Sequence, residues 1–184
     1  MGIRLSAARH WQLSVTQPTG RVLALPFLFL ADGTEWSQWS KLAGSAGYTS
    51  QVLSIPKAAQ ANAQTAASKV AHELARSSNA FPPLIFARRE LGLIAEHYCE
   101  SNGSAGLVLV EPARSDALTY EPTFPIVLIG SKQDKEGLRA HRLLVDADPD
   151  DGPELIVTAD EQHVSLDRPE TFDLLLDWLE RRDL

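Results

Sequence analysis

The sequence predicts an α/β protein, with a mostly parallel sheet that carries helices on both faces. Two observations support this prediction. Short, continuous apolar runs such as GLVLV at 106–110 and IVLI at 126–129 are typical of strands that are covered on both sides. Segments with helical spacing, such as residues 169–181, alternate with these runs. The chain has 184 residues, enough for one compact core, so we expect residues 1–184 to form a single domain.

The N-terminal part predicts two strands joined by a turn. Residues 11–15 alternate between polar and apolar, residues 17–20 (QPTG) form a turn signal, and residues 21–30 are rich in bulky apolar side chains. We expect the two strands to pair antiparallel at an edge of the sheet. Because proline cannot donate to a strand ladder, the second strand is predicted to end near Pro26.

A helix, a strand and a second helix are predicted next. Residues 35–46 bring Trp36 and Trp39 roughly onto one face, which we interpret as packing. Residues 51–55 form a short apolar run that Pro56 closes. Residues 57–77 are rich in Ala and Gln and predict a helix from intrinsic propensity.

The central stretch of the chain predicts a strand, a sharp turn and a helix. Residues 84–87 are apolar and read as a buried strand, and residues 91–100 show helical spacing. The turn between them is Arg88-Arg89-Glu90. Cys99 falls on the predicted helix, so we expect a buried thiol.

The C-terminal half continues the alternation of strands and helices. It also contains a short connector at 113–123 and an acidic, turn-rich loop at 146–152. The predicted strands are 106–110, 126–129 and 155–158, and the predicted helices are 135–144 and 169–181, the last with proline in its first turn.

Composition excludes several classes of function. The net charge is −7, with 24 acidic and 17 basic residues, which argues against nucleic-acid binding. No apolar run reaches the roughly 20 residues of a membrane span. The single cysteine excludes an internal disulfide and fits a reducing, intracellular compartment, with the cytoplasm favoured. Arg4 and Arg9, in an N-terminal segment without acidic residues, leave a mitochondrial location open. No glycine-rich phosphate loop or metal-ligand spacing occurs, so no cofactor or metal is expected.

Four landmarks together resemble the α/β-hydrolase superfamily. They are the strand–turn–helix at 84–98, GLVLVEP, PIVLIGSKQD, and LIVTADEQHVSLDRPETFDLLLDWL, and the resemblance covers roughly residues 11–184. It implies a nucleophile in the turn, an acid at Asp134 and a catalytic histidine at His163. The connector at 113–123 leaves no room for a lid domain, so the chain resembles a short, lidless member.

The resemblance also implies that the nucleophile is missing. Residues 87–91 superpose on the family's Gly-x-Ser-x-Gly turn, and Arg89 takes the nucleophile position. Arginine stays protonated and cannot attack a carbonyl. Ala87 and Leu91 replace the glycines, which predicts a relaxed or differently shaped turn. Pro26-Phe27 takes the place of the family's oxyanion loop, and proline offers no N–H there.

We therefore expect a non-catalytic domain that serves as a binding or structural subunit of a protein assembly, with Asp134 and His163 as vestigial residues. One alternative is a small esterase with a displaced nucleophile, Ser131 or Ser104. Another is an anion or metabolite site built from Arg88 and Arg89 at a helix N-terminus. The simpler reading of Arg89 is an ion pair with Asp134, Glu90 or Glu111, and the simpler reading of Asp134 is a helix cap.

Overall fold

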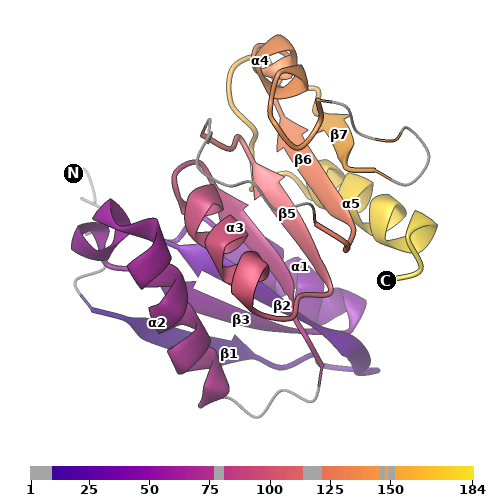
Figure 1. Cartoon of the computed structure of the whole chain (residues 1–184). Coiled ribbons are helices and arrows are strands. Elements are labelled where there is room, and N and C mark those ends of the chain that lie inside the picture. The colour runs from indigo at the N-terminus through magenta and orange to yellow at the C-terminus, as the bar shows by residue number, and fades with distance from the viewer. Residues whose placement is uncertain (1–9, 77–80, 114–121, 146–147, 149–151) are drawn as a thin grey trace, which may run out of the picture.

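The computed structural model describes residues 10–76, 81–113, 122–145, 148 and 152–184. Within those residues the strands form one sheet in the order β1-β3-β2-β4-β5-β6-β7, and only β1 runs antiparallel to its neighbour (Figure 1). The predicted, mostly parallel sheet is thus confirmed. The strands are β1 (Gln12–Thr16), β2 (Leu23–Ala31), β3 (Tyr48–Ser54), β4 (Leu84–Arg88), β5 (Gly106–Val110), β6 (Ile126–Gly130) and β7 (Glu154–Val157).

Helices cover both faces of this sheet, as predicted. On one face lie α1 and α5, and on the other lie α2, α3 and α4 (Figure 1). The helices are α1 (Ser37–Ala46), η1 (Lys57–Ala61, a 3₁₀ helix), α2 (Ala63–Ala75), α3 (Leu91–Ser101), α4 (Lys135–Arg139) and α5 (Pro169–Arg181).

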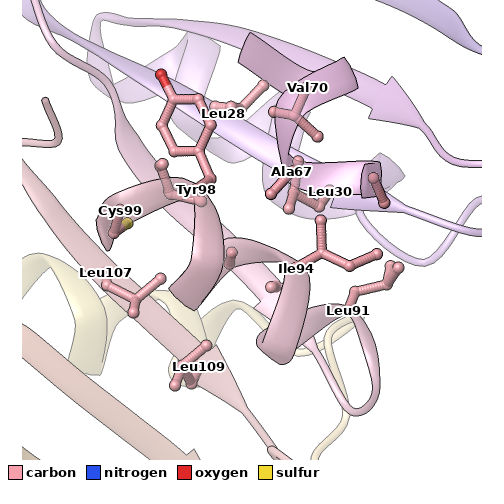
Figure 2. Close-up of a cluster of buried hydrophobic side chains, with 14 of the residues drawn as sticks. Leu28, Leu30, Ala67, Val70, Leu91, Ile94, Tyr98, Cys99, Leu107 and Leu109 are labelled. Carbon is pink, nitrogen blue, oxygen red and sulfur yellow. The ribbon is translucent and has the colours of Figure 1, made fainter. Parts of the chain in front are cut away.

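Two hydrophobic clusters fill the space between the sheet and its helices. In β2, Leu28 and Leu30 face α2 and α3, whereas Phe27 and Phe29 face α1 and α5, because successive side chains on a strand point to opposite faces. Figure 2 shows the first cluster, in which Ile94 of α3 lies with the leucines of β2. Both clusters are needed, since a sheet with apolar side chains on both faces must be covered twice.

The predicted tryptophan and cysteine positions are confirmed. Trp36 and Trp39 have no exposed surface, and the Trp36 indole N–H donates to the carbonyl of Leu30 at 2.7 Å. Cys99 is only 6% exposed and lies on the inner side of α3 (Figure 2). Burial raises the pKa of the Cys99 thiol to about 12. None of the helices in the described part of the chain is both long and apolar enough to cross a membrane.

The predicted pairing of the first two strands is wrong. β1 pairs antiparallel with β3, and β2 lies inside the sheet, parallel to both β3 and β4. β2 also does not end near Pro26 but continues to Ala31. The register of β2 against β3 shifts between Leu23 and Phe27, so the missing N–H of Pro26 falls at an irregularity in the ladder. Pairing with β4 starts after the proline, at Phe27.

Two predicted helices are shorter than expected. The helix expected at 57–77 is divided at Asn62, whose side-chain oxygen accepts from the backbone N–H of Thr65 at 2.9 Å and so caps α2. The helix expected at 135–144 ends at Arg139, and turns follow it. Most of the connector at 113–123 and of the acidic loop at 146–152 lies outside the described residues, so the expected absence of a lid stays a prediction.

The order of the strands positions the site. After β2 the chain passes to β3 on one side, and the next strand, β4, lies on the other side of β2. The helices that follow β2 and β4 also leave toward opposite faces, α1 to one and α3 to the other. In open α/β sheets such a reversal of strand order leaves a crevice at the carboxyl ends of the strands, where ligands bind.

Candidate functional site

The turn after β4 is sharp and strained. Arg89 has a φ of +52°, in the left-handed region that side chains other than glycine rarely adopt. β4 ends at Arg88 and α3 begins at Leu91, so only two residues reverse the chain. Of the two alternatives predicted from Ala87 and Leu91, a relaxed or a differently shaped turn, the relaxed turn is therefore wrong. Both side chains are buried, and the chain must bend abruptly at Arg89 to return α3 onto the sheet.

A second left-handed residue follows the neighbouring strand. Glu111 comes directly after β5 and has a φ of +47°. Its backbone N–H donates to the carbonyl of Ile129 at 2.8 Å, while the N–H of Arg89 donates to the carbonyl of Val110 at 3.0 Å. These bonds hold both strained residues at the carboxyl edge of the sheet. Strain of this kind persists only where the surroundings over-determine it, and it is concentrated at functional sites.

The Glu111 carboxylate joins the turn to the C-terminal loop. Arg88 donates to Oε2 of Glu111 from Nε at 2.9 Å and from Nη2 at 2.7 Å, and Nη2 of Arg89 lies 3.3 Å from the same oxygen. The other oxygen, Oε1, accepts from the backbone N–H of Val164 at 2.7 Å. Arg88 also donates to the carbonyl of Val164 at 3.0 Å. A side chain that is only 6% exposed thus connects three segments that are distant in sequence.

His163 belongs to the same cluster. Its Nδ1 lies 3.3 Å from Oε1 of Glu111, and its side chain is 70% exposed. The structure does not bring His163 to Asp134, the acid expected from the sequence: among the described residues no hydrogen bond or ion pair joins the two. The acidic partner of the histidine is Glu111, which sequence reasoning considered only as a partner for Arg89. The position of Glu111 directly after a buried strand was the sequence signal that could have identified it as a site residue.

Asp134 serves a local purpose instead. Its carboxylate accepts from the hydroxyl of Ser131 at 2.7 Å and from the backbone N–H of Ser131 at 3.3 Å. Asp134 stands at the N-cap position of α4 but makes no side-chain cap bond to that helix. The predicted capping role is therefore wrong, because the carboxylate bends back toward the strand end and stabilises the β6–α4 turn.

Neither serine considered as a displaced nucleophile has a free hydroxyl beside His163. Ser131 has no exposed surface, and its hydroxyl is bonded to Asp134 and to the carbonyl of Gln162 at 2.9 Å. Ser104 precedes β5, and its hydroxyl donates to the carbonyl of Gly106 at 2.7 Å. Ser104 therefore lies near the amino end of β5, whereas Glu111 directly follows the carboxyl end. The five residues of the strand, at 3.3 Å each, separate these two ends by about 16 Å.

The loop after β2 differs from the expected oxyanion loop. Pro26 and Phe27 lie inside β2, so their assignment to that loop is wrong. The loop that reaches the carboxyl edge is Asp32-Gly33-Thr34-Glu35, and the backbone N–H of Asp32 donates to Oε1 of Glu35 at 3.0 Å. An Asp-Gly pair after an apolar run is a turn signal, and this signal could have placed the loop correctly.

A groove lies between this loop, the turn after β4 and the C-terminal loop. It has two adjoining compartments with volumes of about 710 and 310 Å³. We call it the strand-end groove and define it by the four residues that line both compartments. These are Asp32, Glu35, Lys57 and Arg88.

Each compartment also has its own lining. The larger one is completed mainly by polar residues of the β2–α1 and C-terminal loops, among them Thr34, Ser165 and Asp167. The smaller one is completed by Arg89, Glu90 and Leu91. Among the described residues no group of three or more His, Cys, Asp or Glu side chains could hold a metal ion. The volumes lie in the range of small-molecule sites.

Comparisons with known proteins define the class of fold. No family model matches the sequence, and no curated protein matches it. Solved structures do match. A predicted CIB-like hydrolase from Thermoplasma acidophilum superposes with a TM-score of 0.68 at 14% identity, covering 100% of both chains. A serine hydrolase homologue from Coxiella burnetii gives 0.63 at 12% identity, covering 92% of this chain and 91% of that one.

A plant enzyme gives a similar result. Acyl-protein thioesterase 2 from Zea mays superposes with a TM-score of 0.62 at 12% identity, covering 93% of this chain and 98% of that chain. Structural similarity at such low sequence identity establishes the fold alone. The protein therefore has the α/β-hydrolase fold, and the resemblance inferred from the sequence is confirmed at that level.

Proposed function

We propose that this chain is a single-domain, non-hydrolytic binding subunit built on the α/β-hydrolase fold. The observation that carries the proposal is the pairing of Arg89 with Glu111. A cationic side chain stands in the sharp turn after β4, and the carboxylate that contacts His163 also holds this arginine. Acyl transfer needs a nucleophile next to its base, and guanidinium cannot serve as one.

Two further features support the proposal. The hydroxyl of Ser131 is bonded to Asp134 and to the carbonyl of Gln162, that of Ser104 is bonded to the carbonyl of Gly106, and the Cys99 thiol is buried within α3. Burial holds the pKa of that thiol at about 12, so little thiolate forms near neutral pH. An inert thiol also fits an intracellular location, which we retain as part of the proposal.

The experiment that tests this function measures hydrolysis directly. The purified chain is incubated with a fluorophosphonate probe and with p-nitrophenyl esters of several acyl lengths, next to an active serine hydrolase. We expect no labelling and no turnover above buffer. Turnover that His163→Ala abolishes would show that the protein is an esterase after all. Repeating the assay with Ser131→Ala would then show whether that hydroxyl is the attacking group.

The subunit role has its own test. A tagged chain expressed at its natural level in its own cells should elute from a sizing column well above the mass of one chain. Elution as a single chain, before and after mild crosslinking, would exclude a stable assembly and leave small-molecule binding as the function. The matched sample is the same chain purified to homogeneity, which fixes the elution position of the isolated subunit.

A further inference from the structure

The strand-end groove carries charges of both signs, and their distribution identifies the class of ligand. Of the residues that line both compartments, Asp32 and Glu35 are anionic and Lys57 and Arg88 are cationic. Lys57 and Asp32 form a long ion pair, in which Nζ of Lys57 lies 3.8 Å from Oδ2 of Asp32. The Lys57 side chain is 68% exposed and the Asp32 side chain is 43% exposed. A pair as exposed as this one is easily exchanged for a ligand.

Arg88 does not offer its charge to a ligand. Its side chain is 18% exposed, and its guanidinium gives two hydrogen bonds to Glu111 and one to the carbonyl of Val164. With Arg88 neutralised in this way, the larger compartment is lined by Asp32, Glu35 and Asp167 against Lys57 alone. Asp167 makes no hydrogen bond or ion pair among the described residues. The larger compartment is therefore anionic and suits a cationic group.

Arg89 adds a cationic group to the smaller compartment, which Asp32, Glu35 and Glu90 also line. Its side chain is 50% exposed, and its single ion pair is a 3.3 Å contact to a Glu111 oxygen that already accepts two shorter bonds from Arg88. Guanidinium has five N–H donors in a fixed plane, so most of those on Arg89 remain for a ligand. A carboxylate matches this geometry with two parallel hydrogen bonds.

We propose that the strand-end groove binds a small zwitterion of the amino-acid type. The ligand's carboxylate is held by Arg89 in the smaller compartment, and its ammonium lies against Asp32, Glu35 and Asp167 in the larger one. A simple dianion would meet the carboxylates that line both compartments, and a simple dication would meet Arg89 and Lys57. A ligand that carries both charges can pair its carboxylate with Arg89 and its ammonium with the carboxylates of the groove. This inference rests on the proposed binding function and names its ligand class.

The test uses the full chain at low ionic strength. Each of the twenty common amino acids is added singly, and the shift in the unfolding temperature is recorded. The best one is then titrated calorimetrically, together with its N-acetyl derivative, which lacks the ammonium, and its methyl ester, which lacks the carboxylate. We expect the free amino acid to bind and both derivatives to bind at least about tenfold more weakly, since each loses a charged hydrogen-bond partner.

Variants assign the two ends of the ligand. Arg89→Gln should weaken binding of the free amino acid about tenfold and leave that of the methyl ester unchanged. Asp167→Asn should weaken binding of the methyl ester and leave that of the N-acetyl derivative unchanged. Arg139→Gln on α4 and Asp173→Asn on α5 are surface controls away from the groove and should bind like the original chain.

Three outcomes overturn the inference: no amino acid shifts the unfolding temperature, the N-acetyl derivative binds as tightly as the free amino acid, or both groove variants bind like the original chain. The proposed function is separated from the inference by mass spectrometry of the recovered methyl ester. A cleaved ester would reject the non-hydrolytic role while the ligand class stands. An intact ester without any amino-acid binding would reject the ligand class alone.

Discussion

Nδ1 of His163 lies 3.3 Å from Oε1 of Glu111, and the other oxygen of the same carboxylate binds Arg88 at the end of β4 and Arg89 in the turn that follows. The acid that contacts the histidine and the counter-ion of the arginines are therefore one side chain. A change at Glu111 must affect the turn and the C-terminal loop together, because no other carboxylate in the described part of the chain is bonded to Arg88.

Removing the charge of Glu111 should destabilise the fold strongly. In Glu111→Gln the mostly buried Arg88 keeps its positive charge without a carboxylate, and breaking a buried ion pair in this way costs about 3–5 kcal/mol. Urea unfolding measures the loss. Glu136→Gln is the matched control, because Glu136 is 81% exposed in its pair with Arg139, and it should stay within about 0.5 kcal/mol. Equal stability of the two variants would show that Glu111 does not hold the cluster together.

The strain at Arg89 can be measured by comparing two variants. Arg89→Ala and Arg89→Gly both lose the guanidinium, but only alanine keeps a Cβ in the left-handed conformation at φ +52°. We expect the glycine variant to be more stable than the alanine variant by about 1 kcal/mol in urea unfolding.

The same pair of substitutions at Glu136 on α4 gives the control. At that exposed helical site glycine should be less stable than alanine, by up to about 1 kcal/mol. Alanine more stable than glycine at both positions would show that the turn is not strained in solution.

The buried carboxyl of Glu96 should make stability depend on pH. Its side chain is 1% exposed and pairs with Arg142, and burial raises its pKa above the ordinary value of 4.5, while Arg142 opposes the rise. Above pH 4.5 the folded state therefore binds more protons at this group than the unfolded state does. The group's contribution to the unfolding free energy then falls as pH rises through the raised pKa.

Glu96→Gln isolates this effect. The variant lacks the titrating group, whereas Arg142 stays charged throughout, so the original chain should lose stability relative to the variant as pH rises from 4.5 to neutrality. Urea unfolding of both proteins at several pH values measures the difference. A difference that stays constant, or that changes in favour of the original chain, would contradict a raised pKa.

The Cys99 thiol should be unreactive in the folded protein. It is 6% exposed, and burial raises its pKa to about 12, so both access and thiolate content are low at pH 8. A thiol reagent such as DTNB should react slowly with the native chain and at once in 6 M guanidinium chloride. Cys99→Ser combined with Val22→Cys gives the exposed control, since Val22 is 65% exposed. If Cys99 in the native chain and the cysteine of the control variant reacted at equal rates, α3 would have to open readily in solution.

Much of the fold could be predicted from local patterns. The buried strands β4, β5 and β6 are short apolar runs, and α5 begins at Pro169, where the sequence placed it. The pairing of β1 and β2 could not be read in this way. Two neighbouring strands joined by a turn signal normally pair, but here β3 returns from farther along the chain and inserts between them.

The candidate site was predicted only in part. The turn with Arg89 and the histidine loop were located, because each follows a recognisable apolar strand. Glu111 as the partner of His163 was not predicted, because Asp134 also follows a buried strand, a few residues after the end of β6. The sequence does not show which of the two carboxylates reaches the histidine loop. The loop that begins at Asp32 was assigned to Pro26-Phe27, six residues too early, because proline was given more weight than the continuous apolar run that follows it.

The sequence by itself predicted most of the segments that become strands and helices, and it determined that a permanently charged arginine takes the turn after β4. These properties depend on neighbours along the chain, such as apolar spacing and side-chain type. The tertiary structure alone decided that Glu111 is the common partner of Arg88, Arg89 and His163, and that Lys57 and Asp167 line one groove. Contacts between strand ends depend on the order of the strands in the sheet, which is set by the packing of both faces at once.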